Sequence, residues 1–130
     1  MKATELMIGD WVCLKDDTKC EFPLKVDGVL TDDISLEGEG FLGGVDGLIR
    51  PIPITPEILE KNGFIKVNSQ RYDYGHPDTD CYVKVNPKKN MIHTNGRNAN
   101  SNLYSHSFVH ELQRALRLCG LNELADNFKV

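Results

Sequence analysis

The stretch around Thr55 constrains this chain most, because it specifies one short helix with both of its ends marked. Thr55 supplies a hydroxyl that can cap the first turn, and Pro56 stands at the first helical position, where no N–H is needed. Asn62 and Gly63 supply the left-handed exit that commonly ends a helix. These signals predict a helix near residues 56–62.

The prolines at positions 51 and 53 keep the chain extended before this helix, because proline continues neither a helix nor a central strand. The chain is therefore divided into residues 1–54, expected to form a small β-barrel, and residues 55–130, expected to form an α+β subdomain.

The front part contains short apolar runs separated by tight turns and no helical pattern. Ile34 and Leu36 alternate with polar neighbours, which is the period of a strand. The run Phe22–Leu30 also has strand character, and Asp27-Gly28 within it indicates a bulge. The glycine-rich stretch 38–47 predicts a loop. Four or five such strands predict a small SH3-like β-barrel, with a five-stranded Greek-key closure as the competing topology.

The back part alternates between strand and helix patterns. Residues 64–67, 71–74, 80–85 and 91–94 predict a four-stranded antiparallel meander, followed by an asparagine-rich loop over 95–102. A second helix is predicted near residues 105–119, capped by Ser105 or Ser107 and ended by Gly120. One apolar stripe runs along it, formed by Phe108, Leu112, Ala115, Leu116 and Cys119. Glu111, Gln113 and Arg114 are expected on its outer face, and Arg117 is expected to face water. The predicted fold class is therefore α+β, with an antiparallel sheet packed against two helices.

Composition narrows the function classes. The 130 residues carry a formal net charge of −4, which argues against a bulk polyanion-binding surface, since such surfaces need clustered Lys and Arg. The first residues contain no long apolar segment, and no stretch reaches the roughly 18 apolar residues of a membrane span. We therefore expect a cytoplasmic protein that makes no membrane contact.

The four cysteines, Cys13, Cys20, Cys81 and Cys119, have irregular spacings and form no Cys-x-x-Cys motif. This spacing does not support a zinc ribbon or a thioredoxin-type motif. In a reducing compartment they are expected to be small buried hydrophobic residues. A bridge between Cys13 and Cys20 is conceivable only in an oxidising setting, and the prediction is against it.

His106 and His110 are four residues apart, so they share one helix face with a two-ligand spacing. Glu111 follows, but Arg114 stands where a zinc-protease helix would need its second histidine. No third ligand lies nearby in the sequence, although His76 or His93 could approach in the fold. The simpler interpretation is that His110 hydrogen-bonds backbone at the helix entry. No metal, no cofactor and no catalytic residue are predicted, and the chain is not expected to be an enzyme.

A nucleic-acid-binding function has more support in the sequence. Aromatic side chains on a sheet can stack on bases while basic neighbours contact phosphates. The residues that would do so are Tyr72, Tyr74, Lys84, Lys88, Lys89 and Arg97. The competing interpretation is that the tyrosines share a core face and that the lysines in the turn are simply solvated.

Three segments together resemble a known family: Thr4–Val12, Pro51–Phe64 and Phe108–Gly120. In order and spacing they are similar to the opening, middle and ending motifs of small uncharacterised bacterial proteins that are often found near prophage or mobile-element genes. The chain departs from that pattern at Arg114 and Arg117. The resemblance implies no activity and no catalytic residues.

A signature made of a strand start, a capped helix and a packing helix is typical of a scaffold. We therefore predict a non-enzymatic cytosolic protein-interaction or adaptor module that serves a mobile element and binds an unknown protein partner. Nucleic-acid binding is the alternative. The strand edge at Pro51–Ile54 could pair with a second copy, which leaves a homodimer open.

Overall fold

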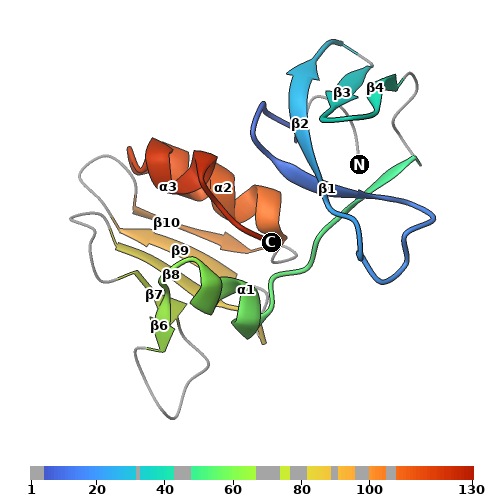
Figure 1. Ribbon diagram of the computed structural model, residues 1–130. Helices are drawn as coiled ribbons and strands as arrows, with labels where there is room; N and C mark the ends of the chain where they lie inside the picture. The colour runs from blue at the N-terminus through green and yellow to red at the C-terminus, as the bar shows by residue number, and fades with distance from the viewer. Residues whose placement is uncertain are drawn as a thin grey trace. The chain divides into compact units, whose positions relative to one another are not determined.

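The computed structural model describes residues 5–31, 33–42, 48–66, 74–76, 82–88, 91–95, 100–104 and 108–130. The chain forms two compact units, Met1–Ile52 and Pro53–Val130 (Figure 1). Each unit has its own antiparallel sheet.

The first unit is a five-stranded antiparallel sheet with the strand order β4-β3-β2-β1-β5. Its strands are β1 (Trp11–Leu14), β2 (Leu24–Val29), β3 (Ile34–Leu36), β4 (Gly40–Leu42) and β5 (Ile49–Pro51). The register of β2 against β3 shifts between Val26 and Gly28, which confirms the bulge expected at Asp27-Gly28. The strand β4 lies inside the glycine-rich stretch that the sequence predicts as a loop.

The predicted SH3-like barrel is wrong, because this sheet stays open. In the described part of the chain, β4 and β5 form opposite edges and do not pair with each other. A barrel needs strands long enough to tilt and pair with a staggered register on both sides. The strands β3, β4 and β5 have three residues each, which leaves too few ladder positions for closure.

The core of the first unit is a small apolar cluster under this sheet. Its buried members are Leu6, Val12, Val26, Ile34, Leu36 and Ile49. Ile34 and Leu36 are buried while Ser35 between them is half-buried, as the alternation in β3 predicts.

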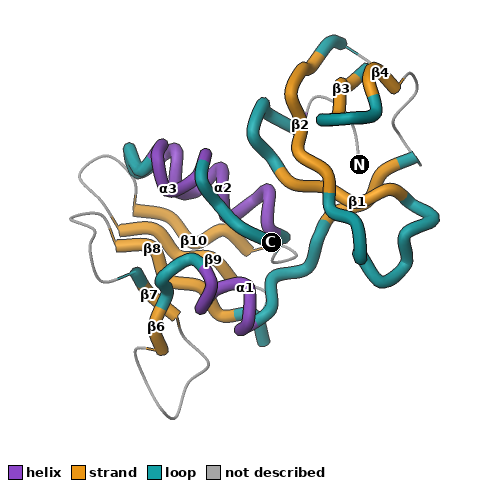
Figure 2. Tube along the Cα trace, in the orientation of Figure 1, coloured by secondary structure: helices purple, strands orange, loops and turns teal. Residues whose placement is uncertain are grey.

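The second unit combines a five-stranded antiparallel sheet, in the order β10-β9-β8-β7-β6, with three described helices. Its strands are β6 (Ile65–Lys66), β7 (Tyr74–Gly75), β8 (Tyr82–Asn86), β9 (Met91–Asn95) and β10 (Asn100–Tyr104). Its helices are α1 (Pro56–Lys61), α2 (Val109–Leu118) and α3 (Asn122–Asp126). Helix α2 contacts both β9 and α3 (Figures 1 and 2).

The strand β10 corrects the prediction of an asparagine-rich loop over residues 95–102. Asn100 pairs with Asn95 and Tyr104 pairs with Met91, so the chain returns alongside β9 as a full five-residue strand. Asparagine and serine have low intrinsic strand propensity. Here the neighbouring strand supplies ladder hydrogen bonds that outweigh that propensity, and the sheet has one strand more than the predicted meander.

The helix α1 has the ends that its sequence predicts. The Thr55 hydroxyl accepts a hydrogen bond from the Ile58 N–H at 3.3 Å, and Pro56 opens the helix. The helix ends at Lys61, and Gly63 adopts φ +83° just beyond it. Most residues avoid this conformation, so glycine suits the exit.

The helix α2 begins at Val109, four residues later than the lower bound of the prediction. Phe108 has an extended backbone that forms an isolated bridge with Pro53, so the helix cannot start before it. The Phe108 N–H donates to the Glu111 carboxylate at 3.3 Å. The predicted caps Ser105 and Ser107 lie outside the described residues. The apolar stripe is confirmed at Leu112, Ala115 and Leu116, all fully buried; Phe108 and Cys119 are half-buried.

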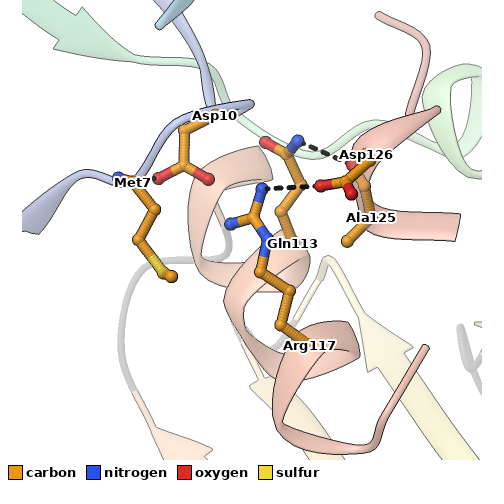
Figure 3. A network of polar contacts seen from close by, with 6 residues as sticks. All are labelled: Met7, Asp10, Gln113, Arg117, Ala125 and Asp126. Atoms are coloured by element: carbon orange, nitrogen blue, oxygen red, sulfur yellow. Dashed lines mark hydrogen bonds and ion pairs between the residues drawn. The ribbon is translucent and has the colours of Figure 1, made fainter. Parts of the chain in front are cut away.

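Two buried amides tie the end of the chain into the second unit. The Gln113 amide donates to the Ala125 carbonyl at 3.0 Å, which joins α2 to α3 (Figure 3). The Asn62 amide donates to the carbonyls of Ile58 and Lys129, and its oxygen accepts from the Lys129 N–H, each at 2.8 Å. Buried amides with bonded partners fix a packing arrangement and supply no chemistry.

Two predictions about the outer face of α2 are therefore wrong. Gln113 is 0% exposed instead of covering the outer face, because its amide reaches the carbonyl of the next helix. Arg117 retains only 12% of its side-chain exposure and pairs with Asp126 at 3.7 Å (Figure 3). Such a pair with an exposed carboxylate contributes little to stability.

Candidate functional site

The loop between β1 and β2, whose path Figure 2 shows, combines two hydrogen-bonded turns with one residue in a left-handed conformation. The Asp17 N–H donates to the Leu14 carbonyl and the Cys20 N–H donates to the Asp17 carbonyl, both at 3.0 Å. Cys20 adopts φ +52°, a conformation that residues other than glycine rarely adopt. Two successive turns therefore fold the loop back toward β1.

Asp17 organises this loop through its side chain. Its carboxylate accepts hydrogen bonds from the Glu21 N–H at 2.9 Å and the Phe22 N–H at 2.8 Å. Arg50 donates to the Asp17 carbonyl at 2.6 Å. The bonds from Phe22 and Glu21, with a smaller contribution from the Arg50 charge, hold the pKa of Asp17 below its ordinary value of 3.8. The ionised carboxylate is thus the form that supports the loop.

Cys13 and Cys20 form a disulfide, which corrects the prediction that these cysteines stay unpaired. Their Cα atoms lie 5.7 Å apart, a separation that suits a bridge. Cys13 is fully buried on β1, whereas Cys20 is half-buried at the end of the loop. The physical reason is the double turn at Asp17 and Cys20, which brings the two sulfur atoms together and which the spacing in the sequence does not reveal.

A pocket of about 450 Å³ lies beside this loop. It is lined by apolar side chains of Leu14, Phe22, Leu24 and Leu48 and by polar side chains of Lys15, Asp16, Asp17 and Glu39. Phe22 is 74% exposed and Leu48 is 46% exposed. The volume falls in the range typical of ligand pockets, and its apolar lining opens onto solvent.

The charged side chains that line the pocket are mostly acidic, and we call their carboxylates the acidic rim. Three carboxylates, those of Asp16, Asp17 and Glu39, stand against the single ammonium of Lys15, a formal charge of −2 (three negative, one positive). A small apolar surface with a negative rim attracts an apolar group that carries positive charge next to it.

Pro23 is the feature of the sequence that could have indicated that Phe22 lies in the loop. The strand pattern over Phe22–Leu30 hides this feature. The pattern predicts a strand over Phe22–Leu30, but β2 begins at Leu24. Pro23 cannot donate to a strand ladder, so Phe22 before it lies in the loop, where its side chain is largely exposed and lines the pocket.

The residues predicted for nucleic-acid binding lie in different surroundings. Tyr74 is 6% exposed and belongs to the core, in a row of paired residues with Val85 and Ile92. Its ring is therefore not available for stacking on a base. Lys84 is half-buried and Lys88 is exposed. Tyr72, Lys89 and Arg97 lie outside the described residues.

Of the two histidines predicted as a weak metal-binding pair, His106 and His110, the structure describes only His110. His110 is 7% exposed, and its ring stacks on that of Phe108 with centroids 6.1 Å apart. His106 lies outside the described residues. Among described side chains, the one group with metal-ligand character is Cys13, Asp17 and Cys20, whose ligand atoms all lie within 4.8 Å of one another.

The strand edge proposed for a homodimer is partly occupied. The strand β5 is an edge of the first sheet, and beyond it Pro53 bridges to Phe108 within the second unit. Dimer formation stays a prediction.

Comparison of the chain with protein-family models, with curated proteins and with solved structures found no match. The resemblance to the prophage-associated family therefore stays a prediction from the sequence motifs. None of the helices in the described ranges has the length and apolar character needed to cross a membrane.

Proposed function

We propose that this protein is a non-enzymatic protein-interaction module whose pocket binds an apolar side chain of a partner protein, flanked in the partner by Lys or Arg. The observation that supports this proposal is the exposed apolar lining at Phe22 and Leu48 inside an acidic rim. Exposed apolar surface rimmed by polar residues commonly marks a site of protein–protein contact.

The chemistry of the lining favours binding over catalysis. The described residues around the pocket include no histidine, cysteine or serine. Both carboxylate oxygens of Asp17 accept backbone hydrogen bonds, so this group is engaged in holding its own loop. The acids at the rim thus serve as a source of negative potential.

The expected interaction is weak and reversible. Burying one Leu- or Phe-sized side chain contributes about 1.5 to 3 kcal/mol. Interfaces of small area are typical of transient contacts. We include in the proposal a cytoplasmic location and a partner from a mobile element, which rest on composition and on the sequence resemblance.

The test is a selection from a displayed library of random peptides against the immobilised full-length protein. We expect enrichment of peptides that place a large apolar residue next to Lys or Arg. Fluorescence anisotropy then measures the affinity of one selected peptide for the wild-type protein and for its variants. Phe22→Ala removes the apolar wall and should weaken binding about tenfold, which corresponds to 1.4 kcal/mol.

Matched controls separate the pocket from the rest of the surface. Leu30→Ala removes another exposed apolar side chain, 55% exposed, outside the pocket and should change the affinity by less than about twofold. Glu39→Lys should weaken binding, whereas Glu37→Lys on the same turn, outside the pocket lining, should have less effect. Added salt should also weaken the wild-type complex.

The proposal fails if no peptide is enriched, or if Phe22→Ala and Leu30→Ala bind equally well. Retention of single-stranded or duplex oligonucleotides at low ionic strength, lost as salt rises, would instead support the nucleic-acid alternative.

A further inference from the structure

The Asp17 carboxylate lies close to the sulfur atoms of Cys13, on β1, and Cys20, in the loop after it, which the disulfide joins. We propose that, once the Cys13–Cys20 bond is reduced, Cys13, Cys20 and Asp17 bind one Zn²⁺ ion. The ligand atoms of these three residues all lie within 4.8 Å of one another. Asp17 also lines the neighbouring pocket, but this proposal does not require that the pocket binds a peptide.

The 4.8 Å upper limit on the separation of the three ligand atoms is compatible with a zinc site. Zinc binds thiolate sulfur at about 2.3 Å and carboxylate oxygen at about 2.0 to 2.2 Å in tetrahedral geometry, so its ligand atoms lie roughly 3.5 to 3.8 Å from one another. The Asp17 carboxylate already lies within 4.8 Å of both sulfur atoms, whereas the two sulfur atoms are bonded to each other and must separate to this spacing after reduction.

The backbone of the loop holds the ligands in place before any ion arrives. The Glu21 and Phe22 N–H groups orient the Asp17 carboxylate, and each oxygen keeps a further lone pair for a metal. Hydrogen-bonded carboxylates of this kind are a common feature of metal sites. The turn from Asp17 to Cys20, closed by the 3.0 Å backbone bond, fixes the spacing of these two ligands.

The charges also suit a soft divalent cation. Two thiolates and one carboxylate carry three negative charges, which Zn²⁺ and the neighbouring Arg50 guanidinium, bonded to the Asp17 carbonyl, offset. Thiolates favour zinc over magnesium or calcium. Three protein ligands leave a fourth position for water or an outside ligand, and half-buried Asp17 and Cys20 give that position access to solvent.

Opening the site requires reduction of the disulfide by an external thiol or phosphine. Two electrons and two protons enter the disulfide and produce two thiols: two reductant thiols supply them and become a disulfide, or one phosphine supplies the electrons and takes oxygen from water, which provides both protons, to become its oxide. Zinc binding then displaces the thiol protons to solvent. A cytoplasm keeps thiols reduced, so the ion-binding form would be the resident one in the proposed compartment.

The test uses full-length protein with Cys81→Ser and Cys119→Ser, which leaves Cys13 and Cys20 as the only cysteines. The protein is reduced with tris(2-carboxyethyl)phosphine and titrated with Co²⁺, whose thiolate charge-transfer absorption reports sulfur ligation. We expect this absorption to saturate at about one equivalent, to be absent from the oxidised protein and to be abolished by Zn²⁺.

Variants identify the ligands. Cys20→Ser should abolish the absorption. Asp17→Asn should weaken Co²⁺ binding by about tenfold or more. Asp16→Asn removes the adjacent carboxylate and should change Co²⁺ binding by less than about twofold. Near-ultraviolet circular dichroism of Trp11 checks that each variant keeps the fold of the first unit. An absorption that survives Cys20→Ser, or none in the reduced parent, overturns the site; equal binding by the two aspartate variants overturns the role of Asp17.

Discussion

The buried amides of the second unit contrast with the carboxylates around the pocket of the first unit. In the second unit, Asn62 and Gln113 are buried and their amides bond to backbone, so they lock one packing arrangement. In the first unit, Asp16 and Glu39 are exposed and Asp17 is half-buried, and these acids line the pocket together with exposed Phe22. The difference agrees with the proposal that the first unit carries the binding surface and that the second unit is mainly scaffold.

The units also differ in what stabilises them. The second unit buries a helix face, with Val109, Leu112, Ala115 and Leu116 all fully buried. The first unit spans only Met1–Ile52 and has the bridge between Cys13 and Cys20. Domains of this size rarely gain enough from a single core, and they commonly need a covalent or metal link. Such a link lies next to the pocket, so it would stabilise the unit and also shape the proposed binding surface.

The largest effect that tests this comparison is expected from Leu112→Ala. Leu112 is 0% exposed, so truncation leaves a cavity and should lower the free energy of unfolding of the second unit by about 2 to 5 kcal/mol. Far-ultraviolet circular dichroism reports the helices, all described in that unit, and fluorescence of Trp11, the single tryptophan, reports the first unit.

The matched control is Leu118→Ala on the same helix, where the side chain is 61% exposed and the expected change is within about 0.5 kcal/mol. If Leu112→Ala lowers the free energy of unfolding measured by Trp11 fluorescence as much as the value measured from the helices, the two units unfold together. The comparison of the units then loses its basis.

A smaller effect is expected from opening the bridge in the first unit. The cysteines are separated by 7 positions, and closing a loop of that length should stabilise the unit by about 2 to 3 kcal/mol. We expect reduction, with a chelator present, to lower the midpoint of the Trp11 transition in urea while the helix transition stays unchanged. Equal shifts in both transitions would contradict this assignment of roles. Zinc added to the reduced protein should recover part of the loss if the proposed site forms.

The elements that could be predicted from the sequence are those whose signals are local. Thr55, Pro56 and Gly63 act within one helix, so α1 follows from a few neighbouring residues. The alternation of Ile34 and Leu36 likewise predicts β3. The strand β10 could not be predicted, because its weak propensity is overridden by pairing with β9, a contact set by the tertiary fold.

The candidate site could not be predicted for a similar reason. The Cys13–Cys20 bridge depends on the left-handed backbone of Cys20, which no residue type at that position signals. The pocket brings Glu39 and Leu48 beside the β1–β2 loop through sheet pairing. Two residues with functional chemistry in the sequence, Tyr74 and His110, are buried in the second unit, because aromatic and imidazole rings also serve as packing groups.

The smallest expected effect concerns Asp17 and acid. Hydrogen bonds from the Phe22 and Glu21 N–H groups lower the folded-state pKa of this carboxyl below 3.8, so the ionised group stabilises the fold. A depressed pKa contributes stability that is fully present above the unfolded-state pKa and is lost as the pH falls through the folded-state pKa. The stability difference between wild type and Asp17→Asn should therefore be constant near neutral pH and shrink below about pH 4.

Urea unfolding of the oxidised proteins, followed by Trp11 fluorescence at a series of pH values, measures this difference. The reference is Asp16→Asn, which removes the same charge from the same turn but leaves both backbone bonds to Asp17 in place. Coincident curves for the two variants would mean that these bonds do not hold the loop. A distinct curve for Asp17→Asn alone would establish that the pocket wall of the first unit depends on one ionised side chain, which is the reverse of the neutral, buried amides that organise the second unit.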